Sequence, residues 1–418
     1  MRNVRSATAL ALLTVPGSRK PRLLVLNQYY WPGVEATAQL LTDLCEALAE
    51  DVDVTVVTGV LHGLEDQPRR HAHNGVEIIR VRSTSFERSK LFARASNYVT
   101  YLSNALLRGL RGPRPDVVLC MTDPPIVADV ALLVARRYRA PLVVISQDVF
   151  PEIAVQLKRL ENPVVMKLLR SLVSLYLRRA DRIVAIGDTM RQRLEEKGAP
   201  SERVRVIPNW VDTQRLVPRD RANEWARNIG LDKKFVVMHS GNVGHAQDLD
   251  SLVRAATFLR DLDDLSIFII GTGARHAELV ALAEQLEVDQ VTFLYYQSRG
   301  VLPQSLSAAD VHVVGLAPGL AGYVVPSRLY GILAVARPVI VAADPESETA
   351  QVVERVGCGI VVPPGRPELL ARAIRDAHDG KYDLVEMGRR GREWVEREAD
   401  RSVAVNRYRD LLRELAPS

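Results

Sequence analysis

Short apolar runs alternate with helical patterns along this chain, in two successive sets. Short runs rich in Val, Ile and Leu are typical of buried parallel strands, and apolar residues three or four positions apart are typical of helices. The first set covers residues 23–207 and the second covers residues 235–362. Each set predicts a mostly parallel, Rossmann-like α/β sheet with helices on both faces.

Polar and charged sequence separates the two sets between residues 208 and 234. A chain of 418 residues also exceeds the usual size of one domain. We therefore predict two Rossmann-like domains, over residues 21–207 and 208–394, that face a central cleft. Residues 393–415 have a helical pattern, and we expect a C-terminal helix over 395–418 to pack back on the first domain.

The first twenty residues carry a different pattern. Arg2 and Arg5 precede an apolar run over residues 7–15, which is too short to span a bilayer. The run resembles a weak signal peptide, but no cleavage site of the Ala-x-Ala type follows it. We expect residues 1–20 to be a disordered extension or the product of a mis-chosen start codon.

Composition narrows the class of protein. Hydrophobic residues make up 47% and charged residues 25%, as in a soluble globular protein, and the formal net charge of +5 is too small to indicate nucleic acid. Cys45, Cys120 and Cys358 are far apart and predict reduced core residues of a cytoplasmic protein. The chain contains no Walker lysine, no HExxH and no Cys/His cluster, so we expect no bound metal and no separate cofactor.

Residues 318–342 predict a loop, a helix and a buried strand. Pro326 and Ser327 suit the first turn of a helix, and Arg328 would add a full positive charge there. A helix N-terminus reached through a flexible loop is suited to bind an anion. The alternative is an ordinary loop–helix–strand unit with a surface arginine.

Two glycine-containing loops follow predicted strands of the second domain. They cover residues 241–247 and 271–273, with glycines at 241, 244, 271 and 273. Glycine lets backbone N–H groups approach a phosphate closely, although it also marks any tight turn. Together with residues 326–328, three such loops fall at the strand ends of one sheet, which predicts a phosphate site.

Carboxylates follow the predicted strands of the first domain, at Glu35, Asp123, Asp148 and Glu152. In a cleft, a carboxylate can orient a hydroxyl or accept its proton. Solvated loop acids and helix caps are the alternative for each of them. Asp148 is the strongest candidate, because it directly follows an apolar strand and precedes a turn restricted by proline.

The order and spacing of these segments resemble the retaining GT-B glycosyltransferases of family 4. More narrowly, they resemble bacterial sugar transferases of surface-polysaccharide synthesis, such as the fucosamine transferase group. The resemblance covers nearly all of the chain from Pro21 onward. It rests on NQYYWPGVEATAQLLTDLCEAL, QDVFPEIA, RADRIVAIGDTMRQRL, VRVIPNWVD, SGNVGHAQDLDSLVRAA, IIGTGARHAEL, LPQSLSAADVHVV and VPSRLYGILAVARPVI.

The resemblance implies a hexosyltransferase-type, metal-independent enzyme that moves a sugar from a nucleotide-sugar, a UDP-sugar, to a glycan or polyprenyl-linked acceptor with retention. It implies catalytic roles for Asp148, Glu35 and Arg328. The implied donor-binding residues are Gly241, Asn242, Gly244, Gln247, Gly271, Gly273, Tyr296, Gln297, Pro326, Ser327, Arg328 and Leu329. The implied acceptor-binding residues are Gln28, Tyr30, Gly33, Asp123 and Glu152.

The chain departs from the family at four positions. Two glutamates that members carry eight positions apart align with Tyr323 and Gly331, and the usual basic pair aligns with Asn242 and Gln247. Either the subgroup uses Arg328 instead, or the protein is a weakened or silent partner subunit. A nucleotide-sugar 2-epimerase of related fold is a third reading, but the chain shows no His and acid cluster for it.

Two basic amphipathic stretches, residues 86–111 and 158–179, belong to the predicted first domain. Leu, Phe and Tyr beside Arg and Lys suit the interface of an anionic bilayer. Core-facing helices show the same apolar stripe, which is the alternative. We expect a peripheral contact with the inner face of the plasma membrane, in part through Arg88, Lys90 and Arg94. The sequence does not indicate an oligomeric state.

Overall fold

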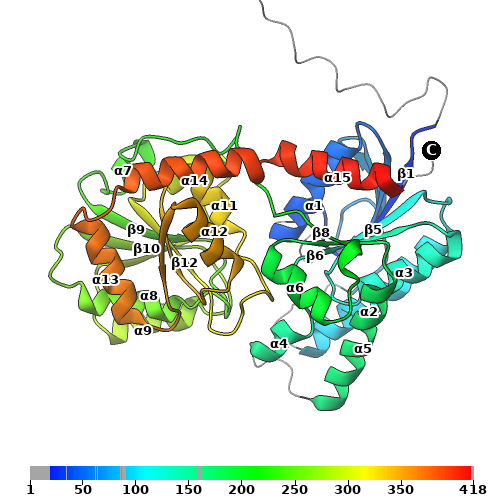
Figure 1. Ribbon diagram of the computed structural model, residues 1–418, viewed down its shortest axis with the longest axis horizontal. Coiled ribbons are helices and arrows are strands. Elements are labelled where there is room, and N and C mark those ends of the chain that lie inside the picture. Colours follow the sequence, from blue (N-terminus) through cyan, green and yellow to red (C-terminus); the bar gives the residue numbers. More distant parts are fainter. Residues whose placement is uncertain are drawn as a thin grey trace, which may run out of the picture.

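A computed structural model describes residues 19–33, 35–61, 63, 65–84, 86, 91–157 and 162–415, the side chains of 91–95 excepted. The chain forms two α/β units that lie side by side along the long axis of the molecule (Figure 1). Each unit is built on one sheet, with eight strands in the first and six in the second among the described residues. The expected extension over residues 1–20 lies almost wholly outside the described part of the chain.

The first sheet has the order β3-β4-β2-β1-β5-β6-β7-β8. Every described pairing in it is parallel except that of β3 with β4. Apolar β-branched side chains that are buried on both faces explain why these runs form central strands. The strands are β1 (Arg22–Leu26), β2 (Asp53–Thr58), β3 (Arg70–His73), β4 (Val76–Arg80), β5 (Val117–Met121), β6 (Leu142–Ser146), β7 (Arg182–Ala185) and β8 (Val204–Val206).

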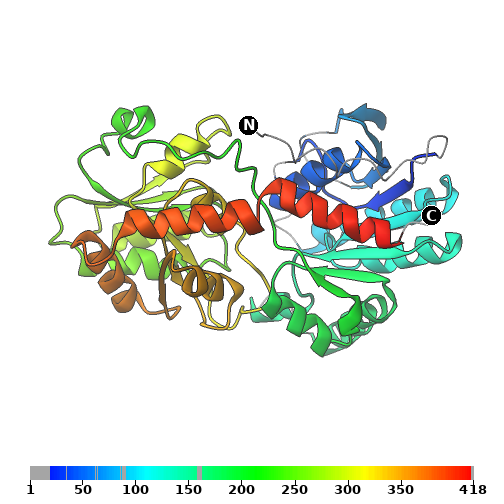
Figure 2. The same ribbon diagram turned by 45° about the horizontal axis from the view of Figure 1, so that its top comes forward.

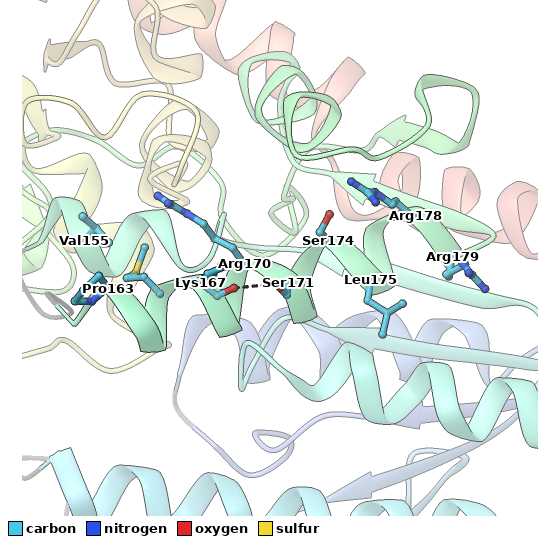
Figure 3. A pocket seen from close by; sticks show the side chains of 10 residues that line it. Val155, Pro163, Lys167, Arg170, Ser171, Ser174, Leu175, Arg178 and Arg179 are labelled. Carbon is cyan, nitrogen blue, oxygen red and sulfur yellow. Dashed lines mark hydrogen bonds between the residues drawn. The ribbon is translucent and has the colours of Figure 1, made fainter.

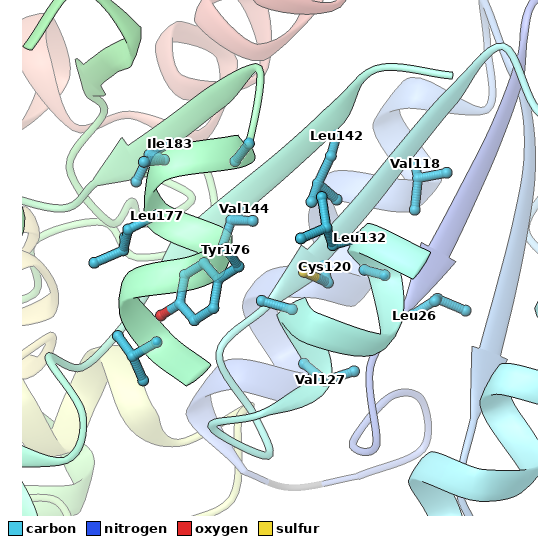
Figure 4. Close-up of a cluster of buried hydrophobic side chains, with 14 of the residues drawn as sticks. Leu26, Val118, Cys120, Val127, Leu132, Leu142, Val144, Tyr176, Leu177 and Ile183 are labelled. Carbon is cyan, nitrogen blue, oxygen red and sulfur yellow. The ribbon is translucent and has the colours of Figure 1, made fainter. Parts of the chain in front are cut away.

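Helices cover both faces of this sheet. On one face, α2 (Leu91–Arg111), α3 (Val127–Tyr138) and α5 (Pro163–Arg179) share a core with the strands, part of which is drawn in Figure 4. On the other face, α1 (Ala36–Leu48) and α15 (Arg401–Leu415) share a second core. The short α4 (Glu152–Gln156) and α6 (Asp188–Glu196) follow β6 and β7.

The second sheet has the order β11-β10-β9-β12-β13-β14, and all its described pairings are parallel. Its strands are β9 (Phe235–Ser240), β10 (Leu265–Ile270), β11 (Val291–Leu294), β12 (Val311–Gly315), β13 (Val339–Ala342) and β14 (Gly359–Val362). The helices are α7 (Glu224–Asn228), α8 (Leu249–Ala255), α9 (His276–Gln285), α10 (Leu302–Ser307), α11 (Arg328–Ala334), α12 (Glu348–Val356), α13 (Pro367–His378) and α14 (Leu384–Glu398).

The C-terminal helices cross from the second unit back to the first (Figures 1 and 2). The continuous helix expected over residues 393–415 is wrong at one point, because α14 ends at Glu398 and α15 begins at Arg401. At the break, the Ala399 carbonyl accepts from the backbone N–H of Val211 at 3.0 Å, and the Asp400 carboxylate accepts from the Thr213 hydroxyl at 2.6 Å. The break therefore lies where the C-terminal segment pairs with the linker between the two units.

Two further points of comparison with the sequence concern β3 and α2. The sequence reasoning did not predict β3, because Arg70–His73 has no apolar alternation and exists as a strand only through its antiparallel pairing with β4. Of the helix expected over residues 86–110, the structure describes α2 from Leu91 onward, and residues 87–90 lie outside the described part of the chain. All three cysteines are buried and free. In the part of the chain that is described, no helix has both the length and the apolar character of a membrane span.

Docking of α15 depends on buried aromatic packing. Tyr408 is fully buried, and its ring meets Trp210 edge-to-face with centroids 5.8 Å apart. We predict that Tyr408→Ala lowers stability by about 3–5 kcal/mol, because it leaves a cavity in the core of the first unit. Chemical denaturation measures this change. Val385→Ala, at an exposed site on α14, is the control and should change stability by less than about 0.5 kcal/mol. Equal effects of the two variants would contradict the packing argument.

Candidate functional site

The carboxyl ends of the two sheets face each other. Asp148, which follows β6, forms an isolated antiparallel bridge with Val324, which follows β12. Nearby, the hydroxyl of Thr189 on α6 donates to the carbonyl of Glu346 at 2.9 Å. Open α/β sheets bind ligands at the carboxyl ends of their strands, so the candidate site lies between the two units.

The two glycine loops of the second unit lie in direct contact. The backbone N–H of Val243 donates to the Thr272 carbonyl at 2.9 Å. Gly271 has a φ of 143°, and a Cβ at that position would lie 1.9 Å from the carbonyl oxygen of Gly241. Only glycine fits there, so the glycines allow the loops after β9 and β10 to form one surface.

The side chains of Asn242 and Gln247 serve this loop itself. The Gln247 Oε1 accepts from the backbone N–H of Gly244 at 3.0 Å, and the Asn242 amide lies beside the same residue. These are the positions at which the family resemblance places a basic pair. The positive charge of the site comes instead from Arg328, at the start of α11 after β12, the strand beside β9 in the sheet.

Arg328 begins α11 and reaches back across the glycine loop. Its guanidinium donates to the imidazole of His239 and, through Nη2, to the Asn242 carbonyl at 3.1 Å. Burial lowers the pKa of Arg328 to about 10, so the group remains charged at neutral pH. Among the described residues, no carboxylate forms an ion pair with it. A partly buried cation without a counter-ion is costly unless an anion binds there.

His239 adds no positive charge beside Arg328. The residue is fully buried at the end of β9, and its pKa lies well below its ordinary value because of burial and then because of the Arg328 charge. The imidazole is therefore neutral and accepts a hydrogen bond from the guanidinium. Sequence reasoning missed this residue. The available signal was a histidine inside an otherwise apolar strand directly before a glycine loop.

The other donor-side candidates differ in their distance from the glycine loops and in their burial. Tyr296 is half-exposed, and its hydroxyl donates to the Thr272 carbonyl at 3.5 Å, so it borders the glycine loops. Gln297 instead accepts from the indole N–H of Trp225 at 3.0 Å. Ser327 is partly buried beside Arg328, and Pro326 is buried. The Leu329 side chain belongs to the core beneath α11, and its predicted contact with a donor stays a prediction.

The backbone at Asp148 brings this residue against the second unit. Its carbonyl accepts from the Ser146 hydroxyl at 3.1 Å, and the next backbone N–H, that of Val149, donates to the Tyr323 carbonyl at 2.9 Å. Burial raises the pKa of Asp148 to about 6. The side chain therefore changes protonation state close to neutral pH, as a general acid or base requires.

Three other first-unit candidates lie at neighbouring strand ends. Glu35 precedes α1, and its carboxylate occupies the space that a Cβ on Gly33 would need, 2.7 Å away. The Asp123 carboxylate accepts from the Thr37 hydroxyl at 3.2 Å, and its carbonyl accepts from the backbone N–H of Gln28 at 3.1 Å. Gln28 is only 2% exposed, so its side chain is buried beneath the surface formed by these strand ends.

Two other acceptor-side candidates, Tyr30 and Glu152, already contact other parts of the first unit, and their roles in acceptor binding stay predictions. Tyr30 is 1% exposed and packs in the core against α1, where burial raises the pKa of its hydroxyl. Glu152 forms ion pairs with Lys197 at 2.6 Å and Arg170 at 3.1 Å. Burial alone would raise the pKa of Glu152, but these partners outweigh it and hold the pKa below its ordinary value. Glu152 therefore joins α4 to α5 and to Lys197, which directly follows α6.

A reciprocal pair of amide hydrogen bonds joins the loop after β6 to the loop after β8. The Gln147 amide donates to Asn209 at 3.1 Å, and the Asn209 amide donates to Gln147 at 3.0 Å. Both residues are buried. Sequence reasoning did not identify this pair. No three His, Cys, Asp or Glu side chains gather as a metal site would need, as far as the described residues show.

Two Rossmann-like units that meet at the carboxyl ends of their strands define the GT-B architecture of glycosyltransferases. Comparison with protein families agrees over most of both units. Residues 35–210 match the "Glycosyl transferase 4-like domain" and residues 221–394 match "Glycosyl transferases group 1". The chain belongs to the GT-B glycosyltransferases of family 4, as the sequence predicts.

Curated relatives carry related names. The chain is 32% identical over 237 residues to the putative colanic acid biosynthesis glycosyl transferase WcaI of Escherichia coli K12, a match covering 56% of this chain and 57% of that protein. It is 28% identical over 310 residues to the probable glycosyltransferase WbjE of Pseudomonas aeruginosa, covering 73% and 76%. The match thus spans little more than half the length of the first relative.

Solved structures share the fold. Anabaena HepE in complex with UDP superposes with a TM-score of 0.73 at 14% identity, over 94% of this chain and 100% of that chain. Sucrose-phosphate synthase from Thermosynechococcus elongatus superposes with a TM-score of 0.75 at 18% identity, over 95% and 99%. The predicted fold class is confirmed.

The unpaired charge of Arg328 makes a specific prediction about ligands. We expect Arg328→Ala to weaken binding of UDP by about 10- to 150-fold, the value of a charge-assisted contact, and to leave binding of uridine nearly unchanged. Isothermal titration measures both. Arg254→Ala, on the exposed side of α8, is the control. Equal and small losses for the two ligands would place Arg328 outside the binding site.

Proposed function

We propose that the protein transfers a hexosyl-type sugar from a UDP-sugar to a glycan or polyprenyl-linked acceptor, with retention of configuration and without a metal ion. The reaction would belong to the synthesis of cell-surface polysaccharide. The observation that carries this proposal is the Arg328 guanidinium, which packs on a glycine loop and has no carboxylate partner among the described residues. A nucleotide diphosphate supplies the missing negative charge.

The same charge also serves the chemistry. As the bond between the sugar and the diphosphate breaks, negative charge grows on the leaving phosphate, and a fixed guanidinium stabilises it more strongly than it stabilises the ground state. Asp148 belongs to the first unit, from which the acceptor hydroxyl would approach the sugar. Its carboxylate can accept the hydrogen bond of that hydroxyl and orient the oxygen toward the sugar.

The names of similar proteins support the donor and the pathway class. One relative is named for colanic acid biosynthesis, and structures of HepE were solved with UDP and with UDP-glucose. The competing reading, a silent partner subunit, draws on the two missing glutamates. Gly331 occupies one of these positions. A Cβ on Gly331 would lie 3.9 Å from Leu216 and from Leu306, so the side chain of a glutamate at this position would start in apolar surroundings.

Ligand stabilisation and turnover together test the proposal. We expect saturating UDP, at about 100 times its Kd, to stabilise the parent protein by about 2.7 kcal/mol in a thermal-shift assay. Asp148→Asn should keep this stabilisation and lose turnover of the UDP-sugar. Because burial raises the pKa of Asp148 to about 6, kcat/KM of the parent should fall as the pH drops below about 6, and the residual kcat/KM of the variant should lack this acidic limb.

Three outcomes would contradict the proposal. A protein that no nucleotide stabilises would favour the silent subunit. Full turnover by Asp148→Asn would reduce that residue to a structural role. Turnover that is lost in EDTA and restored by Mg²⁺ would show that Arg328 does not replace a metal ion at the diphosphate.

We also propose that the first unit contacts an anionic membrane at its cytoplasmic surface, where a polyprenyl-linked acceptor would be presented. The helical layer of α2, α3 and α5 carries the supporting observation. Its sequences hold three arginines in α2, two in α3 and four basic residues in α5, against a single acid, Asp129. The predicted contacts of Arg88, Lys90 and Arg94 lie outside the residues or side chains that the structure describes.

Apolar side chains stand exposed on the outer face of the same layer. Leu168 is 60% exposed and Leu175 42% on α5, Leu133 is 50% exposed on α3, and Val99 is 60% exposed on α2. Along α5, an open groove of about 1090 Å³ is flanked by the basic side chains seen in Figure 3. Leucines beside arginines match a bilayer interface with negative headgroups.

A charge-matched pair of variants tests this contact. We expect Lys167, Arg178 and Arg179, changed together to Gln, to lose most sedimentation with phosphatidylglycerol vesicles at low salt, because each basic residue contributes about 1 kcal/mol. The control changes Lys233, Arg254 and Arg372 to Gln on the second unit. Equal sedimentation of the two triple variants, or no binding by the parent, would contradict the membrane contact.

A further inference from the structure

A loop of the second unit is held inside the first unit. Residues 320–325, which we call the clasp loop, lie between β12 and α11 and begin at Leu320 in the second-unit core. The loop ends at Val325, which is 5% exposed and belongs to the core built by α2, α3 and α5 of the first unit. Apolar side chains are therefore exchanged across the seam, because Ile153 and Leu157 of the α4 region pack on the second-unit core in return.

Tyr323 makes the contacts at the centre of the clasp loop. Its carbonyl accepts from the backbone N–H of Val149 at 2.9 Å, and its half-buried ring packs against the first-unit core. The guanidinium of Arg193, on α6, lies over that ring at 5.1 Å from the centroid. A cation above an aromatic face is an attractive contact that depends on the ring and not on the hydroxyl group.

The backbone of the clasp loop fits closely against α6. Gly322 has a φ of 78°, and a Cβ there would lie 2.8 Å from the Arg193 side chain and 2.9 Å from that of Thr189. The loop therefore approaches the helix more closely than any other residue would permit. This fit presents the ring of Tyr323 to Arg193.

The clasp loop joins the two halves of the candidate site. One residue after Tyr323, Val324 pairs with Asp148, and the same segment continues directly into Arg328 at the start of α11. A shift of the loop would therefore change the separation between the acceptor-side carboxylate and the donor-side cation. The position occupied by Tyr323 is one at which the family resemblance places a glutamate, so the ring gives this position a different task.

We propose that Tyr323 and Arg193 are positioning residues, which hold the two units closed and keep Asp148 opposite Arg328 during sugar transfer. The kinetic consequence rests on the proposed function, whereas the closure does not. Neither side chain needs to touch the substrate. Their contribution is to make the closed arrangement the populated one before acceptor and donor react.

Four variants distinguish the contribution of the Tyr323 ring, that of the Arg193 charge and that of a neighbouring control residue. Tyr323→Leu removes the ring, Tyr323→Phe keeps it without the hydroxyl, and Arg193→Gln removes the cation. Arg191→Gln is the matched control, because Arg191 lies on the same helix and pairs with Asp188 at 3.1 Å. Circular dichroism and thermal unfolding establish that each variant folds.

Small-angle scattering tests closure without any substrate. We expect Tyr323→Leu and Arg193→Gln to show a larger radius of gyration than the parent, and Tyr323→Phe and Arg191→Gln to match it. With UDP-sugar and acceptor, the first two should lose about 3- to 30-fold in kcat, while their Kd for UDP stays within about twofold. Tyr323→Phe should restore kcat.

Each result decides between the two proposals. If UDP binds the parent but the Leu and Gln variants keep both their shape and their kcat, the positioning role is wrong and the proposed function stands. If Tyr323→Phe is as impaired as Tyr323→Leu, the hydroxyl rather than the ring is at work, which also overturns the inference. If no nucleotide binds, the proposed function fails. The scattering data then decide by themselves whether Tyr323 and Arg193 hold the two units closed.

Discussion

The charge of Arg328 is the constraint on which the donor side of this site depends. A guanidinium that packs on a glycine loop loses part of its hydration, and no carboxylate among the described residues compensates for it. The surrounding residues fit this one charge. His239 is neutral and accepts its hydrogen bond, and glycine at position 271 lets the neighbouring loop close against the loop that Arg328 crosses. The outcome, in the part of the chain that is described, is a surface on which the Arg328 guanidinium is held in place without a carboxylate partner.

The second constraint is that this cation reaches an acceptor-side carboxylate only if the two units stay together. The bridge between Asp148 and Val324 and the insertion of Val325 into the first-unit core provide that connection. The C-terminal segment adds another, because α15 is buried against α1 while α14 packs on the second unit. Donor and acceptor functions thus belong to different halves of the chain, and packing between the halves decides whether they can act together.

The sequence predicted the local features of this arrangement well. Central strands are short apolar runs, so the pattern places them without knowledge of the partners, and the glycine loops and Asp148 follow from their positions after those strands. The features it missed depend on distant partners. His239 has meaning only beside Arg328, and β3 only beside β4. Tyr30 and Glu152 have polar groups in loops that follow strands, which is why the sequence favoured them. In the structure, the Tyr30 side chain packs in the core, and Glu152 forms ion pairs with Lys197 and Arg170.

One measurement tests the central claim most directly, namely a crystal structure of the protein with UDP bound. The account predicts that the diphosphate lies between the glycine loops and α11, with its oxygens within hydrogen-bond distance of the Arg328 guanidinium and with Tyr296 at the border of the same site. A diphosphate bound elsewhere, with Arg328 still donating only to His239 and the Asn242 carbonyl, would contradict the account. The charge of Arg328 would then have a purely structural explanation.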